Sequence, residues 1–152
     1  MRLASICRQI IQEQMSIDGE AVPWKDLRLF KEMLLSRSIE TYKLAMQEVH
    51  EITFFDRDIL ELISYDRHTK TESSMALKNA AQTFLYNKKV FVAPPWKEIY
   101  CNDNERKQTF EEAVEVHNSI VNVYLKYGRE IIELPKTSIE NRADFVITHI
   151  FY

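Results

Sequence analysis

The chain has 152 residues, of which 45% are hydrophobic and 28% charged, and its formal net charge is −3. This size and composition are typical of about one soluble globular domain, which buries roughly two-thirds of its surface, so we assign residues 1–152 to a single domain. The acidic balance excludes the basic surface typical of proteins that bind nucleic acid or anionic membranes.

Helices are predicted where apolar residues recur at helical spacing, often behind a capping residue. The predicted helices, in chain order, run from Arg8 to Met15, from Asp26 to about His50, from Asp58 towards Tyr65, from Ser73 or Ser74 to about Leu85, from Phe110 to a stop at Gly128, and from Ser138 to Ile150.

Strands are predicted near residues 52–56, 89–93 and 130–134, where short apolar, β-rich runs end in polar residues or proline. Because these strands alternate with helices, we expect an α/β fold of three layers, with a mostly parallel sheet between two layers of helices.

Cysteine and hydropathy patterns favour a reducing, cytoplasmic location. Cys7 and Cys101 stand alone, with neither the spacing of a zinc site nor a disulfide framework. No apolar run approaches the ~20 residues of a membrane span, and no signal peptide is visible. We therefore expect neither a membrane nor a nucleic-acid partner.

The first predicted strand ends in Asp56 and Arg57. In open α/β sheets, ligands bind beyond the carboxyl ends of strands. A carboxylate there holds Mg²⁺ directly or through water, and a guanidinium meets an anionic group. The alternative, which the pattern leaves open, is an aspartate that only caps the next turn.

Arg106 and Lys107 follow a polar run and precede the long helix. Cations on a lid close over transferring phosphate and neutralise its developing charge. The alternative, which the segment taken alone favours, is a solvated helix start. Likewise, Lys136, Thr137 and Ser138 either hold a nucleobase or cap the last helix, and the pattern favours the cap.

Six ordered blocks carry a resemblance to a known family. They are RQIIQEQ (8–14), AVPWKD (21–26), FFDR (54–57), VFVAPPWKEIY (90–100), NERKQTFEEA (104–113) and IELP (132–135). Together they resemble a bacterial AAA-type ATPase family related to the nicotinamide riboside kinase domain, a branch of the P-loop kinase-like NTPases. The resemblance covers nearly the whole chain, from about Ile6 to Ile150.

The resemblance implies a site for ATP and Mg²⁺. Asp56 would be the metal-facing or substrate-facing carboxylate, Arg57 its cationic neighbour and Arg106 the lid cation. Lys107 would also face the nucleotide, and residues 136–138 would lie near the base.

The chain departs from the family in three places. The family's acidic residue shortly before the RQII block is replaced by Ser5. The chain's only glycines are Gly19 and Gly128, so the sequence holds no G-x-x-x-x-G-K-[ST] loop, and we expect the family's first strand, P-loop and second strand to be missing. The family pattern D-R-G-x-P-D becomes D-R-D-I-L-E over residues 56–61, which puts a second negative charge, Asp58, beside the expected phosphate site.

Three functions remain open. In the first, the chain belongs to an ATP-dependent phosphoryl-transfer or hydrolysis domain and is inactive alone because the P-loop is absent. Alternatively, it is a non-catalytic remnant or interaction module. In the third case another polypeptide, or residues upstream of Met1, would supply the missing part. Separately, exposed sheet edges allow a homo-oligomer or a complementing chain as a partner.

Overall fold

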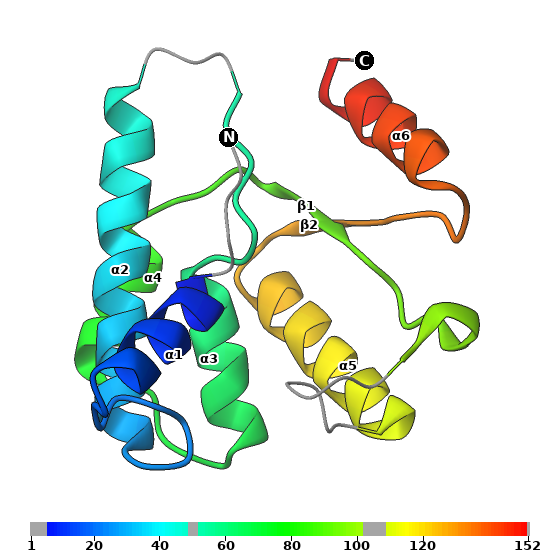
Figure 1. The fold of residues 1–152 in the computed structure, drawn as a ribbon. Helices are drawn as coiled ribbons and strands as arrows, with labels where there is room; N and C mark the ends of the chain where they lie inside the picture. Colours follow the sequence, from blue (N-terminus) through cyan, green and yellow to red (C-terminus); the bar gives the residue numbers. More distant parts are fainter. Residues whose placement is uncertain (1–5, 49–51, 102–108, 152) are drawn as a thin grey trace. The chain divides into compact units, whose positions relative to one another are not determined.

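The computed structural model describes residues 6–48, 52–101 and 109–151, and the chain divides into two compact units, residues 1–86 and 87–152. The described part of the first unit is helical, and the second unit holds both strands found in the described ranges (Figure 1). Within these ranges, no helix is both long and apolar enough to cross a bilayer.

The first unit is built from α1 (Ile6–Ser16), α2 (Leu27–Gln47), α3 (Ile59–His68) and α4 (Met75–Thr83). Helices α1 and α3 pack against α2, and α4 packs against α3 (Figure 1). Apolar side chains from all four helices are buried and form the core, among them Ile10, Phe30, Leu60, Ile63, Leu77 and Ala81.

Side-chain caps begin three of these helices. Asp58 accepts a hydrogen bond from the Leu60 N–H at 2.8 Å, and Ser74 accepts one from the Leu77 N–H at 3.1 Å. Asp26 caps α2 in the same way. Each cap satisfies an N–H group that has no partner inside the helix. The predicted caps Asp58 and Ser74 are thus confirmed.

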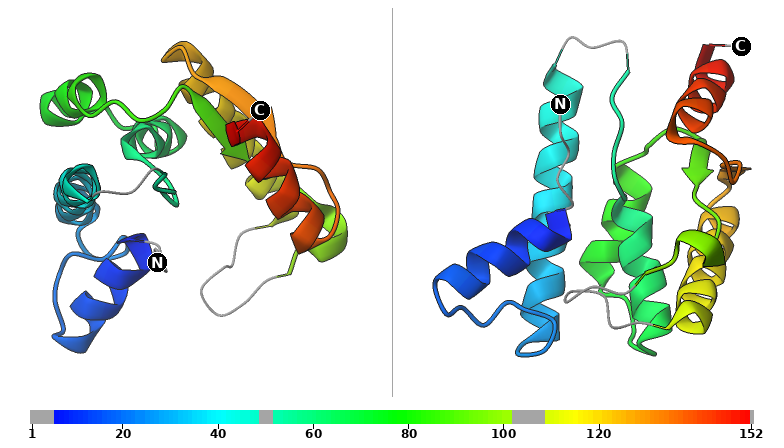
Figure 2. Two further views of the ribbon diagram at one scale, coloured as in Figure 1. Left: turned by 90° about the horizontal axis from the view of Figure 1, so that it is seen from above. Right: turned by 45° about the vertical axis from the view of Figure 1, so that its right-hand side comes forward.

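The second unit pairs two parallel strands, β1 (Lys89–Val92) and β2 (Glu130–Glu133). The chain between them contains the short helix η1 (Lys97–Ile99) and α5 (Phe110–Lys126), and α6 (Ile139–Phe151) follows β2. Helices α5 and α6 lie on opposite sides of the strand pair (Figures 1 and 2).

The ends of α5 follow from local chemistry. Thr109 and Glu112 form a reciprocal capping box at its start, in which Thr109 Oγ1 accepts from the Glu112 N–H at 3.2 Å. Gly128 follows the helix with a φ of +72°, which glycine adopts without a steric penalty. The chain therefore turns at Gly128 and enters β2, as predicted.

The predicted strands at 89–93 and 130–134 are confirmed and are parallel, with Val90 opposite Ile131. The predicted strand at 52–56 is wrong, because residues 52–55 lie in irregular backbone. A strand exists only where a neighbour completes its hydrogen-bond ladder. In the described ranges, the only strand pair is β1–β2.

Candidate functional site

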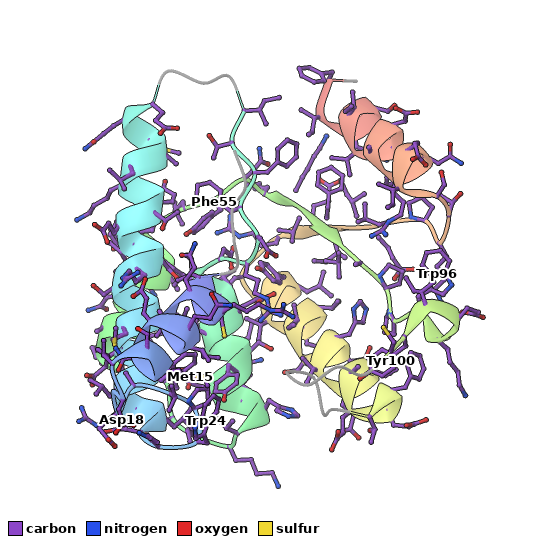
Figure 3. All side chains as sticks on the ribbon, in the orientation of Figure 1. Met15, Asp18, Trp24, Phe55, Trp96 and Tyr100 are labelled. Carbon is purple, nitrogen blue, oxygen red and sulfur yellow. The ribbon has the colours of Figure 1, made fainter. Side chains whose placement is uncertain are left out.

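The segment that leads into Asp56 is anchored by an aromatic cluster of Tyr42, Phe55, Phe84 and Tyr86. The Phe55 ring meets the Tyr86 ring edge to face at 4.9 Å between centroids, and the Tyr42 ring lies 5.0 Å from that of Tyr86. Figure 3 labels Phe55 on this segment. Such pairs favour defined ring geometries. The cluster thus holds the chain just before Asp56, and the Asp58 cap holds it just after.

Between these two anchors, Arg57 has a φ of +73°, in the left-handed region that residues other than glycine rarely adopt. Its guanidinium Nε lies 3.3 Å from Oε2 of Glu61, one helical turn ahead. The Arg57 side chain is 60% exposed, whereas that of Glu61 is 21% exposed. The backbone strain thus occurs where a cation meets a largely buried carboxyl group.

Burial raises the pKa of Glu61 from its ordinary 4.5 to about 7. The positive charge of Arg57 lowers this pKa, and the negative charges of Asp58 and Asp56 raise it further. Glu61 is therefore a carboxyl group that changes its protonation state near neutral pH.

A cavity of about 100 Å³ opens beside these residues, within the first unit. Its apolar wall comes from α1, α2 and α3 and comprises Ile6, Phe30, Leu34 and Leu62. Its charged lining comprises Lys31, Asp56, Arg57, Asp58 and Glu61. Cys7, Ser38 and Tyr65 complete it. The site thus combines an apolar interior with titratable groups.

Burial also raises the pKa of the Cys7 thiol, against the lowering effect of the Arg57 charge. Because the thiolate is the nucleophilic form, a raised pKa leaves Cys7 in its less reactive thiol form. Cys7 therefore serves this cavity as an apolar wall rather than as a nucleophile.

Lys31 is held by a buried partner behind the cavity. It forms an ion pair with Asp66, whose side chain is 1% exposed. Thr71 Oγ1 donates to Asp66 Oδ1 at 3.2 Å, while Asp66 Oδ2 has no hydrogen-bond partner within the described ranges. The pair ties α2 to α3 and commits the Lys31 charge to Asp66.

The predicted site residues fall in different parts of the chain. Asp56 and Arg57 line the cavity of the first unit. Lys136, Thr137 and Ser138 lie in the second unit, between β2 and α6. Arg106 and Lys107 lie outside the described residues.

The loop at residues 136–138 caps α6. Ser138 Oγ accepts from the Asn141 N–H at 3.3 Å, and Thr137 Oγ1 accepts from Asn141 Nδ2 at 3.1 Å. Lys136 is exposed. The favoured interpretation of Ser138 as a cap is thus confirmed, while a role in holding a base stays a prediction.

A metal ion has limited support in the described ranges. They contain no group of three or more His, Cys, Asp or Glu residues that could hold one. Mg²⁺, however, keeps several waters and needs only one or two carboxylates besides its substrate. Asp56 is exposed and fits that smaller requirement, so its metal role stays a prediction.

Sequence reasoning missed the contributions of Glu61, Cys7, Lys31 and Tyr65 to this cavity. The Arg57–Glu61 pair had only a weak signal, the four-residue spacing of opposite charges, because Arg57 precedes the cap of α3 and is not on the helix with Glu61. Cys7 and Lys31 had no signal in the sequence, because α1 and α2 come close to residues 56–58 only in the folded unit.

Comparison with known proteins gave one match. A family model described as an AAA domain matches residues 3–142. No curated protein and no solved structure matched the chain.

Proposed function

The chain belongs to the AAA domain family of P-loop nucleotide-binding proteins. We propose that it is the part of an ATP-dependent phosphoryl-transfer or hydrolysis domain that carries the Asp56 carboxylate and not the phosphate-binding loop. The observation that carries this proposal is the position of Asp56 and Arg57 together in the lining of a partly open cavity.

The proposed roles follow from charge and exposure. Asp56 faces Mg²⁺ or the substrate, and Arg57 and Arg106 neutralise negative charge on phosphate. Lys107 and residues 136–138 contact the nucleotide. The ion pair with Glu61 weakens the attraction of Arg57 for phosphate, because Glu61 already compensates part of the Arg57 charge.

The finer family assignment is also a proposal. The six sequence blocks support a branch related to the nicotinamide riboside kinase domain, and a bacterial source. A three-layer α/β/α arrangement is supported by the parallel pair β1–β2 with α5 and α6 on its two sides.

Activity by this chain alone is not expected. A phosphate cradle needs glycines so that backbone N–H groups can approach the phosphates, and the sequence has only Gly19 and Gly128. Neither belongs to a G-x-x-x-x-G-K-[ST] run. The residues present thus fit the metal side of a nucleotide site and not its phosphate side.

The test is a titration of the full chain with Mg-ATP, followed by calorimetry and by amide NMR shifts. We expect affinity weaker than about 10 μM, or −7 kcal/mol, with shifts at residues 56–61 that Mg²⁺ alone only partly reproduces. Tighter binding would show that the phosphates have another cradle. No shift at millimolar Mg-ATP would contradict the proposal.

The second candidate is a non-catalytic interaction module. It is favoured by exposed apolar side chains on the segment before Asp56, where Phe54 is 55% exposed and Ile52 is 36% exposed. Such residues suit a partner surface. A sedimentation experiment that found only monomers from micromolar to millimolar concentration would remove self-association as that function.

A further inference from the structure

The cavity of the first unit has the size and apolar wall for one small ring. Its volume of about 100 Å³ is somewhat below the ~150 Å³ of an engineered apolar cavity that holds benzene. Ile6, Phe30, Leu34 and Leu62 supply apolar contacts from three helices. A flat ring therefore suits the apolar wall, while a polar substituent on it can meet the charged lining residues, called the rim below, of which Asp56 and Arg57 are exposed.

The charges at this rim do not cancel. Three carboxyl groups and two cations line the cavity. Lys31 is paired with Asp66, which does not line the cavity, and Arg57 is paired with Glu61. Asp58 Oδ1 accepts the Leu60 N–H.

Asp56 is the carboxylate that remains available. It is exposed, and it makes no hydrogen bond or ion pair with any residue in the described part of the chain. The cavity thus presents an unengaged negative charge beside an apolar interior. An anion placed at the same rim would have to compete with Glu61 for Arg57.

We propose that this cavity binds a small ligand in which a flat apolar ring carries a cationic, hydrogen-bond-donating group, with the ring against Phe30, Leu34 and Leu62 and the cation on Asp56. The ligand class comprises aryl amidines, aryl amines protonated at neutral pH and similar compact cations. This site needs no nucleotide, so it stands whether or not the chain takes part in phosphoryl transfer.

The experiment uses three probes of nearly identical shape and different charge: benzamidine, benzamide and benzoate. Each is titrated into the full chain at pH 7.5, and binding is followed by amide NMR shifts. Benzamidine is expected to bind at least about tenfold more tightly than benzamide, and benzoate is expected not to bind. The shifts should be concentrated in residues 56–62 and in the facing turns of α1 and α2.

Two matched variants isolate the proposed contact. Asp56→Asn should weaken benzamidine at least about tenfold and leave benzamide unchanged, because it removes charge at nearly constant shape. The exposed Asp144 of α6 gives the control, and Asp144→Asn should change neither affinity.

Three results would overturn the proposal. One is benzoate binding as tightly as benzamidine, which would make Arg57 the recognition residue. Another is benzamidine shifts that lie outside the first unit, or a benzamidine affinity that is unchanged in Asp56→Asn. The third is no benzamidine binding at 10-millimolar-scale concentrations, roughly −3 kcal/mol, which would leave the cavity without this ligand class.

Discussion

Arg57 Nε and Glu61 Oε2 are 3.3 Å apart, and the two residues differ sharply in their surroundings. Arg57 is mostly exposed and Glu61 mostly buried. An exposed partner stabilises a buried carboxylate only in part, because solvent screens its charge. This explains why the pKa of Glu61 remains near 7 although a guanidinium is in contact with it.

Glu61 is expected to make the protein less stable as pH rises from about 4.5 to about 7. Its pKa is higher in the folded than in the unfolded chain, so the folded state binds more protons in that window and stability falls with rising pH. The full difference corresponds to about 3 kcal/mol. Urea unfolding of the wild type and of Glu61→Gln at pH 5 and pH 8 measures it.

Glu61→Gln removes the titrating group at nearly constant shape. The variant should resemble the wild type at pH 5 and should be the more stable protein at pH 8. All other ionisable groups are common to both proteins, so their contributions cancel in the comparison. Equal pH dependence in the two proteins would show that Glu61 is ionised over the whole range.

Arg57 is expected to carry backbone strain, since its φ is +73°. Arg57→Gly and Arg57→Ala both remove the guanidinium, so their difference isolates the backbone. The glycine variant should be the more stable of the two by about 1 kcal/mol. Glu115 is an exposed helical residue in α5. There the order of stability should reverse, with Glu115→Ala more stable than Glu115→Gly. Thermal unfolding of the four variants decides the point, and the same order at both positions would contradict it.

Much of the helical structure could be predicted from the sequence because its causes are local. Asp58, Ser74 and Ser138 each satisfy an N–H two or three residues ahead, and Gly128 supplies a positive φ. In each cap, the donor and the acceptor lie within one helical turn of each other in the sequence. The positions of α3, α4 and α6 followed from these caps.

The segment after Glu51 could not be predicted in the same way. Its residues I-T-F-F have high β propensity, but propensity describes how well a residue fits a pleated, partnered surface. Residues 89–92 have that partner in residues 130–133, and residues 52–55 have none in the described ranges. Similarly, the cavity required Cys7 and Lys31 to meet Glu61 from other helices.

The ion pair of Lys31 and Asp66 is expected to matter mainly when it is broken. Asp66 is almost fully buried, so Lys31→Met leaves a buried carboxylate without its cation and should cost about 3 kcal/mol or more. The double variant Lys31→Met with Asp66→Asn should recover much of that loss, because no buried charge remains. Urea unfolding of the two single variants and the double variant forms the cycle, and strictly additive losses would contradict the coupling.

Ser138 allows the capping role and the nucleotide role to be separated. Its Oγ accepts the Asn141 N–H at 3.3 Å, so Ser138→Ala should destabilise the protein by about 1 kcal/mol, and Ser138→Asp should retain the cap. Thr148 gives a control in the same helix, since its Oγ1 donates to the Asp144 carbonyl away from the cap. Thr148→Ala should therefore change stability by less than about 0.5 kcal/mol.

If Ser138 serves only as a cap, the Mg-ATP shifts described above will be the same in Ser138→Asp as in the wild type. Unchanged stability in Ser138→Ala, together with weaker Mg-ATP shifts, would instead assign Ser138 to the nucleotide.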